Sequence, residues 1–168
     1  MRALHVLFYR PQQDDHWINH LVSFFSPPFS HCDIQFEDGL ASSIYSNESV
    51  YLQKKRFSRH NYERISLTLS DDEYAMVHEF CMKAHSDKVA FDHAGMLMSY
   101  FPLGSIRRSG RTYCSRYIAE ALKASRRDDF KDVRAGTMSP SGLYQLLKDQ
   151  HRSFVFVAEN RLDQLRAI

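Results

Sequence analysis

Residues 112–122 read TYCSRYIAEAL, and this stretch decides how the chain folds and what it can do. A short polar segment gives way at Cys114 to apolar residues with helical spacing, so the pattern predicts a helix that begins at this cysteine. A thiol in the first turn of a helix lies beside unpaired backbone N–H groups and the positive end of the helix dipole, and both favour its thiolate form. Cys114 is therefore a candidate nucleophile.

The same spacing has a second interpretation. Cys114 opens an i, i+3, i+4, i+7, i+8 stripe that continues with Tyr117, Ile118, Ala121 and Leu122. Such a stripe is typical of the buried face of a helix, and free cysteines are among the most buried residues in proteins. Cys114 could therefore be a core residue instead.

Length and composition predict one globular domain over residues 1–168. Hydrophobic content of 43% and charged content of 25% are ordinary globular values, and a chain of this length can form a core without disulfides. The net charge of +2 does not favour nucleic-acid binding, although Arg107, Arg108 and Arg111 form a basic cluster.

The number of cysteines and the length of the apolar runs indicate the cellular compartment that we expect for the protein. Three cysteines without paired spacing favour a reducing environment over a disulfide framework. The first nine residues lack the apolar run of a signal peptide, and no run approaches the roughly 18 apolar residues of a membrane span. We therefore expect an intracellular, cytoplasmic protein without integral membrane association.

The order of the elements favours an α+β fold. Strands are predicted at residues 3–9, 32–36, 40–45, 50–55, 63–69 and 154–157, with an Asp38-Gly39 turn between the second and the third. Helices are predicted at residues 17–25, with Asp14 or Asp15 as the cap, after a capping box of Ser70 and Glu73, at 94–101, from Cys114, and at 142–149 after Ser139-Pro140. Residues 103–111 read as a loop.

A nucleophilic cysteine needs a base, and His31 stands out among the nine histidines. It begins the first strand of the Asp-Gly hairpin, where a rigid element can aim a side chain at the start of a helix. His16 and His20 share one helix face, but the spacing places no third ligand beside them. We therefore expect neither a metal nor any other cofactor.

Together these motifs resemble the circularly permuted papain-like hydrolases related to NlpC-type cell-wall peptidases, and their phage- or virus-borne members in particular. Residues 30–39, SHCDIQFEDG, precede the cysteine helix, in the reverse of the order in papain. The segment FDHAG at residues 91–95 and the pattern Ser139-Pro140-x-x-Leu143 are similar to further segments of that group. The resemblance implies an antiparallel sheet packed against helices, with the cysteine at a helix N-terminus.

The resemblance also implies a cysteine–histidine mechanism, and it leaves the third catalytic residue open. In the acyltransferases resembling lecithin:retinol acyltransferase a second histidine follows the Asp-Gly turn, and Ser43 occupies that position here. Asp33 is the alternative, because residues i and i+2 of a strand share a face, so that His31 and Asp33 could both face the cysteine. Cys32 points to the opposite face, and we expect it to be structural.

The favoured function is cleavage of an amide in a peptide or protein, by a peptidase, isopeptidase or amidase. The loop carrying Arg107, Arg108 and Arg111 would form a rim of the substrate groove and bind a carboxylate. A thiol acyltransferase or lipid hydrolase is the alternative if the apolar faces of residues 17–29 are exposed. A catalytically inactive binding or structural protein on the same fold is the other alternative, and the oligomeric state is not predicted.

Overall fold

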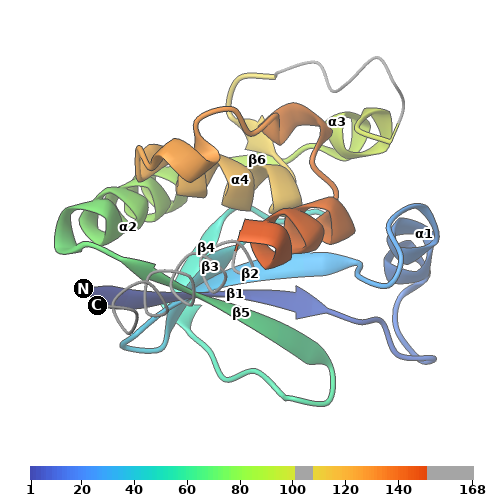
Figure 1. Ribbon diagram of the computed structural model, residues 1–168. Helices are drawn as coiled ribbons and strands as arrows, with labels where there is room; N and C mark the ends of the chain where they lie inside the picture. Colours follow the sequence, from blue (N-terminus) through green and yellow to red (C-terminus); the bar gives the residue numbers. More distant parts are fainter. Residues whose placement is uncertain (101–107, 151–168) are drawn as a thin grey trace.

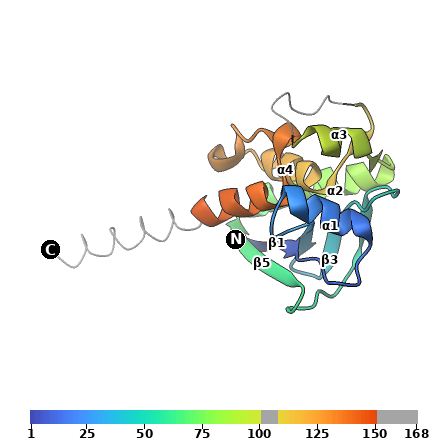
Figure 2. The same cartoon turned by 90° about the vertical axis from the view of Figure 1, so that its right-hand side faces the viewer.

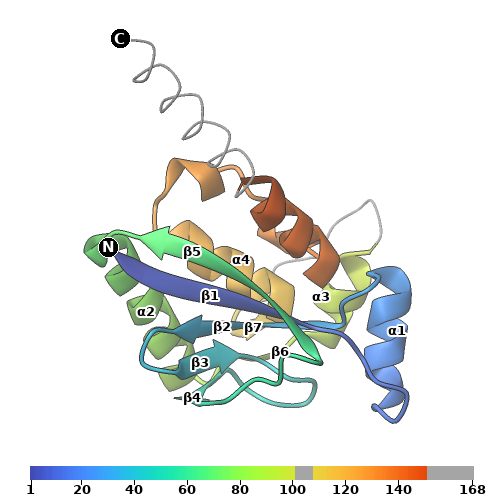
Figure 3. The same cartoon turned by 60° about the horizontal axis from the view of Figure 1, so that its bottom comes forward.

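A five-stranded antiparallel sheet forms the centre of the computed structural model, which describes residues 1–100 and 108–150 (Figure 1). The strands lie in the order β4-β3-β2-β1-β5, which can be followed in Figure 3, where the sheet is turned toward the viewer. Their bounds are β1 Arg2–Tyr9, β2 His31–Phe36, β3 Leu40–Ser43, β4 Tyr51–Lys54 and β5 Tyr62–Leu69. The α+β prediction is confirmed, and the strand expected at residues 154–157 lies outside the described residues.

Helices cover one face of this sheet. They are α2 (Asp71–Ser86), α4 (Cys114–Ala124) and a helix over residues 140–150, while α1 (Trp17–Phe25) lies beyond the end of the sheet (Figure 1). Alternate residues of β1 and β2 point at these helices and are fully or almost fully buried: Leu4, Val6, Phe8, Cys32, Ile34 and Phe36. The period-2 pattern of the two central strands thus sets which side chains form the core.

The hairpin of β2 and β3 forms where the Asp-Gly dipeptide predicts it. Gly39 has φ +83, a conformation that costs glycine little, and the Asp38 carboxylate accepts a hydrogen bond from the Leu40 N–H at 3.0 Å. The turn fixes the register of the two strands, with Ile34 opposite Ser42. It thereby fixes where the rest of β2, including His31, lies.

The helix starts agree with the sequence except at α1. The capping box of Ser70 and Glu73 is present at α2. At α1 the cap is His16, whose ring accepts from the Ile18 N–H, and not Asp14 or Asp15. The Asp15 carboxylate is engaged elsewhere, since it accepts hydrogen bonds from the Tyr9 hydroxyl at 2.7 Å and from the Gln12 N–H at 2.9 Å.

A short parallel strand pair positions the start of α4. Strands β6 (Ala90–Phe91) and β7 (Arg111–Thr112) pair with Phe91 opposite Thr112, an element that sequence patterns did not predict. Each strand leads directly into a helix, β6 into α3 (His93–Met98) and β7 into α4. The pair therefore holds the two helix starts side by side.

The FDHAG segment has a capping role in this arrangement. Asp92 is buried and caps α3, with its carboxylate accepting from the Gly95 N–H at 2.9 Å. A Cβ atom at Gly95 would collide with the Asp92 carboxylate, so this position requires glycine. The helix expected at residues 94–101 is α3, with the shorter bounds His93–Met98.

Candidate functional site

Cys114 is the first residue of α4, as the sequence predicts. The residue before it, Tyr113, has an extended backbone, and its side chain makes no capping hydrogen bond, so the N–H groups of the first turn are not capped by that residue. The helix is anchored behind the cysteine, because Ser115 donates to the Met138 carbonyl at 2.7 Å and Tyr117 bonds Ser42 at 2.6 Å. Cys114 itself is only 5% exposed.

His31 is the first residue of β2 and lies beside Cys114. The backbone of this strand end is fixed by pairing of His31 with Tyr9 and by the Ser30 N–H, which donates to the Tyr9 carbonyl at 3.0 Å. His31 is 6% exposed, and its imidazole and the Cys114 side chain lie close enough for each to shift the pKa of the other. The strand-start histidine and the helix-start cysteine therefore meet.

Asp33 lies on the other side of the imidazole. Its Oδ2 is 3.4 Å from His31 Nε2, and the side chain is fully buried. Neither atom has a well-aligned hydrogen-bond partner among the described residues, so the contact is an ion pair. Loose geometry of this kind is common in unliganded catalytic sites.

The three groups shift one another's ionisation. The pKa of Cys114 is held well below its usual value, first by the hydrogen bond from the Cys32 side chain and then, against the effect of burial, by the hydrogen bond and charge of His31. Burial opposes the charged form of His31, but Asp33 and Cys114 together raise its pKa well above 6.5. Burial likewise opposes ionised Asp33, but His31, Lys55 and Tyr51 lower its pKa. The state favoured at neutral pH is thiolate, imidazolium and carboxylate.

Ser43, the other candidate for the third position, is engaged away from the imidazole. Its hydroxyl donates to the Cys32 carbonyl at 2.6 Å and is buried. That bond holds the end of β3 against β2, beyond the last residues that the two strands pair. The geometry thus favours Asp33 as the residue that orients His31.

Cys32 lies closer to Cys114 than the alternation of side chains along β2 suggests. Its side chain faces the core, yet the Cys32 side chain is the largest cause of the lowered pKa of Cys114, so the two cysteines lie near each other. Burial is the largest cause of a pKa of Cys32 well above 9.0, and the neighbouring Cys114 adds to it, so Cys32 stays a neutral thiol. The sequence predicted only a structural role for Cys32. Alternation along β2 predicts which face of the sheet a side chain takes, but it does not predict that the start of α4 packs against that face.

Tyrosines and a lysine that the sequence did not single out surround the dyad of His31 and Asp33. The ring of Tyr45 lies on the imidazole, Tyr51 donates a hydrogen bond to Asp33, and Lys55 lies 3.7 Å from the Asp33 carboxylate. All three come from the segment after β3, and the loop before β4 is held to β6 by the hydrogen bond from the Phe91 N–H to the Glu48 carbonyl. No local sequence pattern marks them, because their place beside His31 and Asp33 depends on how the segment of residues 44–55 packs in the folded chain.

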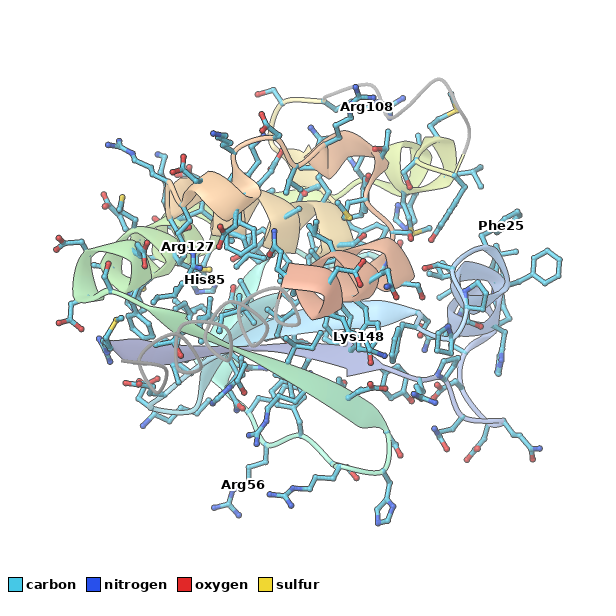
Figure 4. The ribbon with its side chains drawn as sticks, in the orientation of Figure 1. Phe25, Arg56, His85, Arg108, Arg127 and Lys148 are labelled. Carbon is cyan, nitrogen blue, oxygen red and sulfur yellow. The ribbon has the colours of Figure 1, made fainter. Side chains whose placement is uncertain are left out.

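The arginines of the expected substrate rim are placed at a different groove. Arg107 lies outside the described residues. Arg108 and Arg111 line a groove of about 450 Å³ between α2, α4 and the turn before β7, together with Phe80, Lys83, Arg116 and Glu120. Neither Cys114 nor His31 contributes to its lining, and Arg108 lies on the helical side of the molecule (Figure 4).

An exposed apolar surface lies near the site at the end of the molecule that Figure 2 views directly. Four of the seven exposed large hydrophobic residues in the described part of the chain belong to α1, namely Trp17 at 64%, Leu21 at 38%, Phe24 at 79% and Phe25 at 45%. Phe25, labelled in Figure 4, stacks on Tyr100 with ring centroids 5.3 Å apart. Burial is the largest cause of the raised pKa of Tyr100, and the charge of Cys114 adds to it, so the residue on which Phe25 stacks lies within electrostatic range of Cys114.

No protein-family model matches the chain, and neither a curated protein nor a solved structure matches it. Over residues 1–100 and 108–150 no helix is both long enough and apolar enough to cross a bilayer.

Proposed function

We propose that this protein is a cysteine hydrolase that cleaves an amide bond in a peptide or protein through an acyl-enzyme on Cys114. The observation that carries the proposal is the buried row of Cys114, His31 and Asp33, in which each group stabilises the charged form of its neighbour. The proposal includes a circularly permuted papain-like fold, in which the histidine strand precedes the cysteine helix along the chain.

The chemistry follows from the positions of the three groups. The Cys114 thiolate attacks the carbonyl carbon of the substrate, and the backbone N–H of Cys114 at the start of α4 stabilises the oxyanion. The His31 imidazolium then gives its proton to the leaving amine as the carbon–nitrogen bond breaks. Neutral His31 next takes a proton from water, whose oxygen attacks the thioester; the carbon–sulfur bond breaks, the acid leaves, and the Cys114 thiolate and His31 imidazolium are restored.

Burial of the charges supports an active enzyme over an inactive relative. Removing an ionised carboxylate and an imidazolium from water costs several kcal/mol each unless partners compensate. Asp33 is fully buried against His31, at 3.4 Å from its Nε2, and this pair compensates the cost of burying the two charges. An unusual set of coupled titrating groups beside a helix-start cysteine is what thiol catalysis requires.

A second candidate function is a thiol acyltransferase or lipid hydrolase with the same nucleophile. The exposed apolar face of α1 favours it, because Trp17 and Phe24 are mostly in contact with solvent and the helix carries no ionised Asp, Glu, Lys or Arg side chain. An apolar acyl chain beside Phe25 and Tyr100 would reach toward Cys114. The acyl-enzyme chemistry is the same, and only the substrate differs.

Substrate profiling with acyl-enzyme trapping tests the proposal. Wild-type protein, Cys114→Ala and the control Cys81→Ala are assayed on peptide, isopeptide-linked and acyl-lipid substrates at low and high salt, and mass spectrometry follows covalent intermediates. We expect amide cleavage and an adduct on Cys114 in the wild type and the control. Cleavage of lipid esters alone, independent of salt, would select the second candidate, whereas no Cys114-dependent turnover by folded protein would leave a binding protein.

A further inference from the structure

Lys55 points into the protein toward the charged row. Its Nζ lies 3.7 Å from Asp33 Oδ1, the oxygen that does not face His31. The same ammonium donates a hydrogen bond to the Tyr45 hydroxyl and lies 3.4 Å from the Tyr51 hydroxyl. A single side chain thus contacts both the carboxylate beside His31 and the ring that lies on it.

The backbone and ring contacts of Lys55 hold it in this position. Its N–H donates to the Gly39 carbonyl at 3.2 Å, and its carbonyl accepts from the Gln35 side chain at 2.8 Å. The rings of Tyr45 and Phe57 each lie 4.8 Å from the ammonium. With a side chain only 24% exposed, Lys55 differs from its neighbour Lys54, which is exposed.

We propose that Lys55 is a positioning residue of the reaction, which acts on His31 through Asp33 and through Tyr45. The proposal rests on the function proposed above, because it assigns Lys55 to the same site. Within residues 1–100 and 108–150 the Lys55 ammonium contacts Asp33, Tyr45 and Tyr51 rather than Cys114 or the imidazole, so its effect is indirect. It fixes the carboxylate that pairs with His31 and the ring that keeps the imidazole in plane.

The charges then alternate along the row as thiolate, imidazolium, carboxylate and ammonium. Lys55 offsets part of the negative field that Asp33 exerts on His31. Without the lysine charge, the negative charge of Asp33 would act on His31 with no nearby cation to offset it. This would stabilise the protonated form of His31 further. The pKa of His31 would rise further, and the alkaline limit of activity would move to higher pH.

The other titrating groups around the row do not share this effect. Burial is the largest cause of the raised pKa of Tyr9, to about 12, and it likewise raises the pKa of Tyr51, Tyr62, Tyr100 and Cys32, so that these groups stay neutral around neutral pH. Cys114 faces His31 from α4, and its charge is part of the row. Besides His31, Lys55 is the cation that acts on Asp33.

The test compares Lys55→Met, Lys55→Arg and the control Lys54→Met. The kcat, the KM and the pH dependence of turnover are measured, and NMR follows the titration of the His31 imidazole, which needs no substrate. For Lys55→Met we expect kcat to fall at least about tenfold with little change in KM, as for a misplaced catalytic group. We also expect the His31 titration and the alkaline limb to move to higher pH.

Lys55→Arg should return the titration toward the wild-type position, since it restores the charge, and Lys54→Met should match the wild type. If Lys55→Met leaves the His31 titration unchanged, or shifts it no more than Lys54→Met does, the proposal is wrong. If Lys55→Met does not fold, Lys55→Arg and Tyr45→Phe are used instead. Tyr45→Phe should lower kcat and leave the His31 titration unchanged. Wild-type kinetics in Tyr45→Phe would show that Lys55 does not act through Tyr45. A shifted titration without turnover of any substrate would refute the proposed hydrolase while leaving the coupling of Lys55 to His31 established.

Discussion

The ring of Tyr45 lies almost parallel on the imidazole of His31, with ring centroids 4.3 Å apart and an angle of 15° between the planes. Tyr51 in turn stacks on Tyr45, with ring centroids 5.6 Å apart. The imidazole thus has the Tyr45 ring on one face and the Asp33 carboxylate 3.4 Å from Nε2. This restricts rotation of the ring that must face both Cys114 and Asp33.

Replacing Tyr45 tests the stack. Tyr45→Phe keeps the aromatic face but removes the hydrogen bond from Lys55, so kcat should fall measurably, and by less than in Tyr45→Leu. Tyr45→Leu removes the flat surface, and we expect kcat to fall by up to about 100-fold, because small misplacements of a catalytic group cost that much. Steady-state kinetics of the two variants give the comparison, and equal rates would show that the stack does not matter.

Two variants test whether Asp33 or Ser43 orients the His31 imidazole. Asp33→Asn removes the charge beside His31 with little change in shape, and turnover should fall by orders of magnitude, up to about 10⁴-fold for loss of an orienting carboxylate. Ser43→Ala removes only the hydrogen bond to the Cys32 carbonyl, so its effect on kcat should be small. A larger loss in Ser43→Ala than in Asp33→Asn would assign the third position to Ser43.

The three cysteines should differ in reactivity. Cys114 has a pKa well below the usual thiol value, Cys81 has one raised by burial to about 11, and the pKa of Cys32 is also raised. Near neutral pH, iodoacetamide should therefore label Cys114 first, and peptide mass mapping identifies the site. Equal labelling of all three in native protein, or protection of Cys114 alone, speaks against a catalytic thiolate.

The pH dependence of kcat/KM should be bell-shaped. Activity should rise as the pH increases through the lowered pKa of Cys114 and fall as the pH passes the raised pKa of His31, because the ion pair exists between these values. Cys32→Ala removes the largest cause of the lowered pKa of Cys114, so the acid limb should move to higher pH. If the acid limb does not move in this variant, Cys32 does not lower the pKa of Cys114, and His31 and the helix start alone stabilise the thiolate.

A stability variant gives a control outside the site. The Ser70 hydroxyl caps α2 by accepting a hydrogen bond from the Glu73 N–H, and the Glu73 carboxylate accepts one from the Ser70 N–H. Ser70→Ala should lower the free energy of unfolding by about 1 kcal/mol. Urea denaturation measures this change, and the rate of Cys114 alkylation should stay at the wild-type value, since α2 begins away from the thiol.

Local patterns predicted most of the fold. The Asp38-Gly39 turn, the capping box at Ser70 and the helix that starts at Cys114 are all found, because each depends on residues close together in the sequence. The predicted cap of α1 was wrong, because the Asp15 carboxylate accepts a hydrogen bond from the Tyr9 hydroxyl instead. The pairing of β6 with β7 was not predicted, because strands of two residues are too short to show a periodic pattern.

The sequence by itself determined that Cys114 begins a helix and that His31 begins a strand, since both are local features. Only the tertiary structure placed Asp33 beside the imidazole and Ser43 away from it, brought Cys32 near Cys114, and placed Lys55 and Tyr45 around Asp33 and His31. These contacts join segments that the hairpin, the β6–β7 pair and the packing of α4 on β2 bring together. Ionisation in the site depends on burial and on charges a few ångströms away, and neither quantity exists until the chain has folded.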